Sequence, residues 1–344
     1  MRRHVWLMLA LAAAALAPAS CSTRARVEAV MVHGPSLEGN LAGDPADRRV
    51  SVYLPPSYRS ATTRRYPVLY VLHGFGDDDD HWFGRTKHFI DLPALMDRAV
   101  AWGYANEMIV VMPNAYTRFY GSMYSTSVTT GDWETFIATD LVAFVDARYR
   151  TLPAAASRAI AGHSMGGYGT LRLALKHPDV FATAYAMNAC CLAPPTDTEQ
   201  AAGATGVEAV HSFDDLAAAD FTTKLTVASA AAWSPNPARP PLFFDPATRG
   251  GVVQPAIVAR WAANSPLATV ALNTDHIRTL RGLAFDAGDK DSASLLRDLR
   301  ALDRTLAAQG IAHTFEIYDG THDNKVAERF TSVVLPFVSA HLVR

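Results

Sequence analysis

Cysteine is scarce in this chain of 344 residues, which contains only three. Cys21 lies close to the N-terminus, and the other two, Cys190 and Cys191, are adjacent in sequence. A disulfide between neighbouring residues is strained, so we expect two small, partly buried side chains at the end of a strand. Stability must therefore come from a core, for which a hydrophobic content of 49% is ample.

An excess of charge of either sign is also missing. Lysine and arginine total 31, aspartate and glutamate total 33, and no block of basic residues occurs. The sequence therefore lacks the cluster of basic residues that is typical of a nucleic-acid-binding protein. No apolar run after residue 20 is long enough to span a bilayer, so no membrane span is predicted.

The first 20 residues form a separate segment with two early arginines, an apolar stretch rich in Ala and Leu, and then small residues. This pattern is typical of a signal peptide, and "APA" at 17–19 suits cleavage near 19/20. Cys21 also permits a lipoprotein interpretation, with a lipid anchor on that residue. Pro18 stands where such sites carry a larger aliphatic residue, so simple secretion is favoured. The sequence predicts a secreted or periplasmic protein in an oxidising compartment.

From residue 21 to 344, short β-branched runs alternate with helical patterns, which predicts one α/β domain with a mostly parallel sheet. The runs at 66–74 and 107–115 are almost continuously apolar, as expected of strands buried on both faces. Residues 192–265 break this rhythm and are rich in Ala, Pro, Asp and Thr. We interpret them as an insertion over the carboxyl edge of the sheet, a partial lid.

The segment "GHSMG" at 162–166 fits the pattern G-x-S-x-G and lies between a predicted strand and a predicted helix. A serine on such a tight turn projects from the sheet, and Gly162 and Gly166 leave room for the turn. The following helix points its N-terminal amides at the reacting oxygen. We therefore predict that Ser164 is a nucleophile.

A serine nucleophile needs a histidine base and an orienting acid, which follow it in this order on such a fold. Among the histidines after Ser164, only His322 follows the last predicted strand in a glycine-containing loop. The acid should follow the preceding strand, in "FDAGDKD" at 285–291. Asp286 is expected within that strand, whereas Asp289 and Asp291 both fall in the loop and remain alternatives.

Acyl transfer also requires an oxyanion hole of two backbone N–H groups. The candidates are Met165, after the nucleophile, and Phe75 in "HGFG" at 73–76, after the first central strand. The next four residues are "DDDD" (77–80), which we interpret as a solvated turn and helix start rather than a metal site.

These pieces together resemble the esterase D family of α/β-hydrolases, which includes S-formylglutathione hydrolases, feruloyl and acetyl-xylan esterases, and mycolyltransferases. The matching segments run in order from about residue 48 and leave the leader and the insertion unmatched. They are "YPVLYVLHGFGDDDDHW", "VVMPNAYTRFYGSMY", "GDWETFIATDLVAFVDARYRT", "AIAGHSMGGYGTLRLALKHPDVFA", "DAGDKD" and "YDGTHDN". The resemblance implies the α/β-hydrolase fold, with helices on both faces of the sheet. It also selects Asp291, which follows Gly288 after two intervening residues and precedes His322 by 31 positions.

The expected function is a secreted serine esterase that hydrolyses carboxylic esters through a Ser164–His322–Asp291 triad and an acyl-enzyme. The alternatives are an acyltransferase of the mycolyltransferase type and a thioester or S-formylglutathione hydrolase. No metal or organic cofactor is implied, and the expected partner is a small-molecule, glycan or lipid ester. Phe119, Tyr120 and Trp133 are candidates for the substrate pocket.

Overall fold

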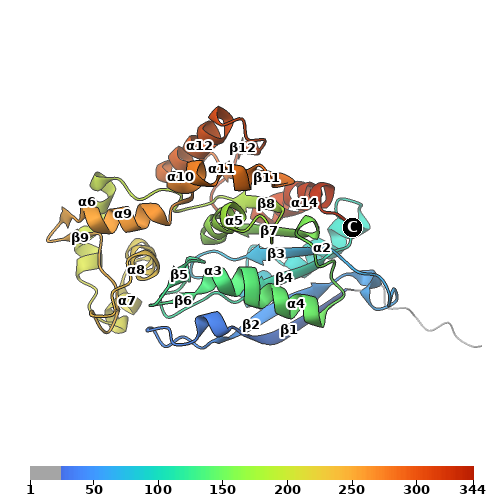
Figure 1. Cartoon of the computed structure of the whole chain (residues 1–344), viewed down its shortest axis with the longest axis horizontal. Helices are drawn as coiled ribbons and strands as arrows, with labels where there is room; N and C mark the ends of the chain where they lie inside the picture. The colour runs from blue at the N-terminus through green and yellow to red at the C-terminus, as the bar shows by residue number, and fades with distance from the viewer. Residues whose placement is uncertain (1–24) are drawn as a thin grey trace, which may run out of the picture.

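The computed structural model describes residues 25–344, so the predicted signal peptide and Cys21 lie outside the described residues. An eight-stranded sheet forms the centre of the molecule, in the order β1-β2-β4-β3-β7-β8-β11-β12 (Figure 1). The six strands from β4 to β12 run parallel to their neighbours, whereas β2 is antiparallel to both β1 and β4. The predicted, mostly parallel sheet is confirmed.

The elements that build this core follow one another as alternating strands and helices. The strands of the large sheet are β1 (Arg26–His33), β2 (Asp47–Leu54), β3 (Val68–Leu72), β4 (Ile109–Pro113), β7 (Arg158–His163), β8 (Thr183–Met187), β11 (Gly282–Gly288) and β12 (Thr314–Tyr318). The helices around it include α1 (Asp79–Trp82), α2 (Leu92–Ala101), α3 (Trp133–Thr135), α4 (Leu141–Arg148), α5 (Met165–Lys176), α10 (Pro266–Thr269), α11 (Thr274–Ile277), α12 (Ala293–Ala308), α13 (Val326–Arg329) and α14 (Leu335–His341). A short hairpin of β5 (Thr126–Ser127) and β6 (Gly131–Asp132) precedes α3.

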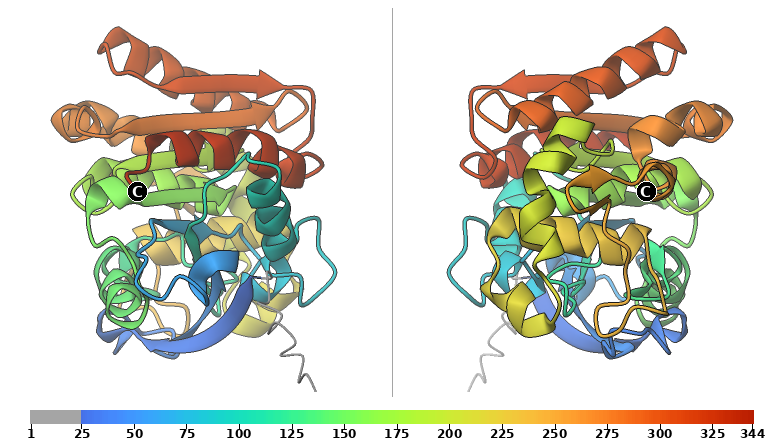
Figure 2. Two further views of the ribbon diagram at one scale, coloured as in Figure 1. Left: turned by 90° about the vertical axis from the view of Figure 1, so that its right-hand side faces the viewer. Right: turned by 90° about the vertical axis from the view of Figure 1, so that its left-hand side faces the viewer.

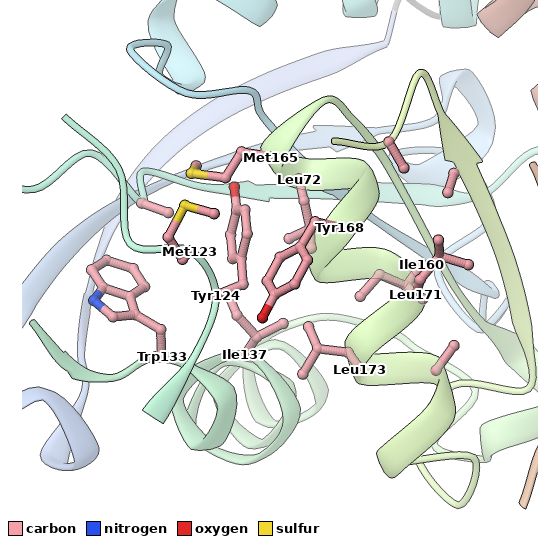
Figure 3. Close-up of a cluster of buried hydrophobic side chains, with 14 of the residues drawn as sticks. Leu72, Met123, Tyr124, Trp133, Ile137, Ile160, Met165, Tyr168, Leu171 and Leu173 are labelled. Atoms are coloured by element: carbon pink, nitrogen blue, oxygen red, sulfur yellow. The ribbon is translucent and has the colours of Figure 1, made fainter. Parts of the chain in front are cut away.

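The two faces of the sheet bury separate sets of side chains, because successive residues of a strand point to opposite sides. In β3, Val68, Tyr70 and Leu72 join one core, while Leu69 and Val71 join the other. Helices α4, α5 and α12 supply side chains to the first core, and α2, α13 and α14 to the second. Figure 3 shows part of the first core, where α5 packs its apolar side chains against the sheet. Helices on both faces were predicted and are confirmed.

Residues 192–265 leave the sheet after β8 and build a group of helices before the chain returns to β11. Its elements are α6 (Asp197–Glu208), α7 (Phe213–Ala218), α8 (Phe221–Trp233), the hairpin β9 (Thr248–Arg249) and β10 (Val252–Val253), and α9 (Pro255–Ala263). The right-hand view of Figure 2 looks onto these yellow and orange segments. The segment is closed at its base, where Leu267 N donates to Leu192 O at 3.0 Å.

A buried ion pair joins β11 to the C-terminal helices. Arg329 Nε donates to Asp286 Oδ2 at 2.6 Å, and the Tyr185 hydroxyl donates to the same oxygen at 2.9 Å. Asp286 is fully buried, as expected of a residue within β11. Burial raises the pKa of Asp286, and the charge of Arg329 opposes that rise. Asp286 therefore has a structural partner and lies apart from the loop that follows the strand.

Replacing Arg329 tests this pair. Because Arg329→Met leaves a buried carboxylate without its cation, we expect a loss of about 3–5 kcal/mol in the free energy of unfolding, measured by urea denaturation. Arg300→Met is the matched control, since Arg300 is an exposed arginine on α12 and should change stability by less than about 0.5 kcal/mol. Equal losses in both variants would contradict this account.

Candidate active site

The loops that carry the predicted functional residues gather at one edge of the sheet. The strands β3, β7, β8, β11 and β12 are parallel, so their carboxyl ends point the same way. The loops after them hold Phe75, Ser164, Cys190, Asp291 and His322, and all five residues border one cavity. This edge is where open α/β sheets bind ligands, and it is the candidate active site.

Ser164 occupies a tight turn between β7 and α5. Its backbone has φ +57° and ψ −117°, a strained conformation for a residue with a side chain. The turn closes because two glycines permit backbone contact: a Cβ on Gly162 would lie 2.4 Å from Gly166 O, and one on Gly166 would lie 2.0 Å from Leu72 O. No side chain fits at either position, which gives the physical reason for the glycines predicted there.

His322 and Asp291 form a hydrogen-bonded pair beside this turn. His322 Nδ1 lies 2.7 Å from Asp291 Oδ2, and the Asp291 side chain is only 6% exposed. The other carboxylate oxygen, Oδ1, accepts from Ser292 N at 2.7 Å, which fixes its orientation. Burial lowers the pKa of His322, but the hydrogen bond and charge of Asp291 outweigh it and raise the pKa above its usual value. The pair therefore stabilises a protonated imidazole.

Asp289, the alternative acid, faces a different partner. Its Oδ1 accepts from Gly320 N at 3.0 Å, and its own N–H donates to Tyr318 O at 2.8 Å. Asp289 thus fastens the loop after β11 to the loop after β12. The geometry assigns it a bracing contact and leaves Asp291 as the aspartate that touches the imidazole.

The backbone of His322 is held by two side chains that sequence reasoning did not single out. His163 Nε2 donates to His322 O at 2.9 Å, and Asn188 Nδ2 donates to the same oxygen at 3.1 Å. Burial lowers the pKa of His163 to about 3, with a contribution from neighbouring His322, so His163 is neutral. Asn188 Oδ1 also accepts from Gly288 N at 2.9 Å, which ties three loops together. The position of His163 inside "GHSMG" was the only sequence signal for this contact.

The two residues predicted for the oxyanion hole, Phe75 and Met165, lie close to the serine turn. A Cβ on Gly74 would lie 3.5 Å from Ser164 Cβ, so the loop after β3 passes directly beside the serine. A Cβ on Gly121 would meet both Met165 Sδ at 2.6 Å and the Phe75 ring at 2.8 Å, so these two side chains pack at one point. Among the described residues, the Phe75 N–H makes no backbone hydrogen bond in its loop, and Met165 is the first residue of α5, where an N–H has no acceptor within its own helix. Both are thus free to donate to a substrate oxygen.

The loop after β3 is anchored by buried side chains. His73 Nδ1 donates to Gly74 O at 2.9 Å, and His73 Nε2 accepts from Ala115 N at 2.8 Å. The Tyr124 hydroxyl donates to His73 O at 3.1 Å. Burial lowers the pKa of His73, which keeps this bridging imidazole neutral. The amide of Phe75 is therefore presented by a rigid loop.

The acidic run at 77–80 is not the solvated turn predicted from sequence. Asp78 caps the start of α1, as expected, by accepting from His81 N at 3.0 Å. Asp79, however, is fully buried and receives Arg49 Nη2 at 2.8 Å and Ser51 Oγ at 2.5 Å. The solvated interpretation was wrong for Asp79, because an antiparallel strand brings Arg49 across it, a pairing that the local sequence does not reveal.

The cavity at this site has a volume of about 690 Å³ and its walls are largely apolar. Much of its lining comes from the insertion and from α12, including Ala204, Val207, Phe221, Leu225, Trp261 and Leu295. A salt bridge between Arg297 Nη1 and Glu199 Oε1, 3.0 Å long, adds charge to the wall. Sequence reasoning missed the residues from the insertion because the family resemblance leaves that segment unmatched, and it did not single out the residues on α12.

None of the three aromatic residues predicted for the pocket borders this cavity. Trp133 is 1% exposed and Phe119 is fully buried, and neither borders the cavity. Trp133 packs in the first core, as Figure 3 shows, with its Nε1 donating to Thr130 O at 2.8 Å. Tyr120 is partly buried beside Phe75, with ring centroids 6.5 Å apart, and also lies off the cavity wall. These aromatic side chains pack against other parts of the protein, and the local sequence does not distinguish such packing from contact with a ligand.

Among the described residues, two groups have metal-ligand chemistry, and both already use their side chains within the protein. One group is His163, His322 and Asp323, in which His322 is bonded to Asp291 and His163 to the backbone of His322. In the other, Asp77 accepts from Trp82 Nε1 at 2.6 Å, while Asp78 caps α1. Neither group presents a set of uncommitted ligands, so we assign no metal or cofactor to them.

The backbone contact at the serine turn yields a direct test. Gly166→Ala places a methyl group against the carbonyl of Leu72, so we expect a loss of about 1–3 kcal/mol or more in unfolding free energy. Gly203→Ala, in α6, is the matched control, because nothing lies within 4 Å of a Cβ there. The control should be neutral or stabilising. Thermal unfolding of both variants provides the measurement, and a stable Gly166→Ala protein would contradict the contact.

Parts of this chain are similar in sequence to known proteins. An esterase of Mycobacterium tuberculosis is 38% identical over 136 residues, which are 39% of this chain and 27% of that protein. A bifunctional endo-1,4-beta-xylanase/feruloyl esterase of Xylanibacter ruminicola is 31% identical over 134 residues, 38% of this chain and 18% of that protein. The chain thus spans less than a third of the length of these curated relatives.

The similarity to known structures covers most of the chain. The structure of a ferulic acid esterase superposes with a TM-score of 0.65 at 24% identity and covers 93% of this chain and all of that one. The α/β-hydrolase fold predicted from sequence is thereby confirmed. A family model described as "Putative esterase" matches residues 45–331. Because that match covers most of the sequence, the chain belongs to this esterase family.

Proposed function

We propose that this protein is a serine esterase that hydrolyses carboxylic esters through an acyl-enzyme. The observation that carries the proposal is the hydrogen-bonded pair of His322 and Asp291, which borders the same cavity as the strained Ser164. Membership of the esterase family supports it independently. An imidazole whose Nδ1 is engaged by a carboxylate has its Nε2 available as a base.

In the proposed reaction, Ser164 Oγ attacks the ester carbonyl while His322 takes its proton. Asp291 holds the imidazole in the tautomer with a proton on Nδ1 and stabilises the imidazolium that forms. The free N–H groups of Phe75 and Met165 bind the negative oxygen of the tetrahedral intermediate. His322 then protonates the leaving alcohol, and water, activated by the same imidazole, releases the acid. No step requires a cofactor.

The proposed substrate is an ester with an apolar or aromatic part. This proposal is supported by the cavity wall, which is built largely of apolar side chains such as Val207, Leu225 and Trp261. The insertion at 192–265 supplies much of that wall, so we propose that it acts as a partial lid that shapes the substrate. Feruloyl esters are a reasonable first class to test, because a relative carries that activity in its name.

We also propose that the first 20 residues form a signal segment that directs export and is cleaved near 19/20. The composition of that segment supports the proposal, with lipidation of Cys21 as the alternative. Mass spectrometry of the mature N-terminus separates a free residue 20 from a lipid-modified Cys21.

Replacement of the serine tests the central proposal. Ser164→Ala should lower the turnover of p-nitrophenyl esters and methyl ferulate by about 10⁴-fold or more, because no other group can form the acyl-enzyme. Ser332→Ala, an exposed serine on the C-terminal helical segment, is the control and should keep full activity. Unchanged turnover in Ser164→Ala would refute the esterase proposal. Product analysis with added alcohols would reveal acyl transfer in place of hydrolysis.

The choice of acid is tested by a pair of conservative variants. Asp291→Asn should reduce kcat by about 10³–10⁴-fold, whereas Asp289→Asn should have a small effect because it only weakens a loop contact. A large loss confined to Asp289→Asn would show that the acid is wrongly assigned.

The same pair predicts a change in pH dependence. His322 must be neutral to accept the proton, so activity should rise with pH through the raised pKa of His322. In Asp291→Asn, burial remains while the carboxylate of Asp291, whose hydrogen bond and charge are the main causes that raise the pKa of His322, is gone, so the midpoint of the acid limb of kcat/KM should move to lower pH. An unchanged midpoint would show that Asp291 is not what raises the pKa of His322.

A further inference from the structure

The cavity wall contains a pair of thiols for which the proposed esterase reaction has no use. Cys190 and Cys191 are free, partly buried, and both border the cavity with Ser164. The Cys191 thiol donates to Cys190 Sγ, and the two sulfurs lie 2.7 Å apart, compared with about 2.05 Å in a disulfide bond. Residues 25–344 contain no other cysteine. Small molecules that enter the cavity can therefore reach a preassembled dithiol.

The backbone of the turn after β8 holds the two thiols together. Asn188 and Cys191 both have positive φ, +43° and +63°, which side chains rarely adopt. Cys190 N donates to Ser164 O at 3.3 Å, and the Asn188 amide reaches His322 O. The turn that carries the thiols is thus bonded to the backbone of both the serine and the histidine of the site.

The two sulfurs differ in proton affinity. The hydrogen bond from Cys191 lowers the pKa of the Cys190 thiol, and nearby His322 adds to this effect. The same hydrogen bond raises the pKa of the Cys191 thiol, because its proton is held between the two sulfurs. Cys190 is therefore the better attacking thiolate, and Cys191 is placed to follow it.

We propose that Cys190 and Cys191 form a dithiol modification site that small-molecule disulfides convert to a vicinal disulfide. The Cys190 thiolate attacks one sulfur of the reagent RSSR, so that a Cys190–SR bond forms and RS⁻ leaves. The Cys191 thiol then loses its proton and attacks Cys190 Sγ, which releases the second RS⁻. The protein loses two hydrogens, and RSSR is reduced to two RSH.

The modification is expected to be reversible and to affect catalysis. The Cα atoms of adjacent residues are about 3.8 Å apart, closer than the span of about 4.4–6.8 Å that relaxed disulfides prefer. Strained disulfides are readily reduced, which suits a labile site. Because the turn is bonded to Ser164 and, through Asn188, to His322, closing the ring should disturb the proposed triad.

Peptide mass spectrometry of the full chain tests the proposal. The reduced protein is treated with hydroxyethyl disulfide, alkylated with iodoacetamide and digested with trypsin, which releases residues 177–224 with no third cysteine. We expect this peptide to carry no alkyl group and no adduct, and to be lighter by two hydrogens than the reduced peptide. A doubly alkylated peptide, or a stable single adduct in the native chain, would overturn the proposal.

Single variants test the order of attack. Cys191→Ser should stop at a stable mixed disulfide on Cys190, and Cys190→Ser should react several-fold more slowly. Equal rates would overturn the assignment of Cys190 as the attacking thiol. This readout does not depend on esterase activity, so it stands or fails separately from the proposed function.

Ester turnover tests the link to catalysis. The oxidised chain should lose most of its turnover and regain it with dithiothreitol, while a Cys190→Ala/Cys191→Ala chain should show no change relative to its own untreated rate. Full turnover in a chain proven to be oxidised would overturn the link to catalysis and leave the modification site in place.

Discussion

The contact between the backbone of Gly166 and the carboxyl end of β3 is the constraint on which the site depends. It lets α5 begin against the sheet with no side chain between them, and it forces Ser164 into its strained conformation. The same closeness brings the loop after β3 alongside the serine, so Phe75 and Met165, from different elements, lie near the same serine. A single methyl group at Gly166 would push apart elements that lie far from each other in sequence.

The second constraint is electrostatic. His163 and His322 lie with ring centroids 4.7 Å apart, yet their pKa values are shifted in opposite directions. Burial and the proximity of His322 keep His163 neutral, whereas Asp291 supports a proton on His322. Two adjacent imidazoles cannot both be charged at low cost, and the location of one carboxylate decides which of them titrates. The neutral His163 ring donates a hydrogen bond to the backbone carbonyl of His322.

The fold and the order of functional residues could be predicted because they depend on local signals. Apolar runs gave buried strands, glycines marked the serine turn, and the loops of Ser164, Asp291 and His322 each follow a strand that ends at the same edge, although only the family resemblance chose Asp291 over Asp289. The contacts that support them come from distant elements. Nothing near "DDDD" indicates that Arg49 buries Asp79, and nothing near Asn188 indicates that its amide joins three loops. The pocket was predicted least well, because Trp133 and Phe119 pack in the core while the wall comes from the insertion.

The way in which the insertion is closed at its base has a consequence for how such proteins diversify. Leu192 and Leu267 are joined by a backbone hydrogen bond, so the excursion starts and ends at nearly the same place. Changes in its length or sequence are therefore absorbed within it and do not pull on the strands that carry the serine, aspartate and histidine. An exchangeable segment of this kind lets the shape of the cavity evolve while Ser164, Asp291 and His322 keep their positions.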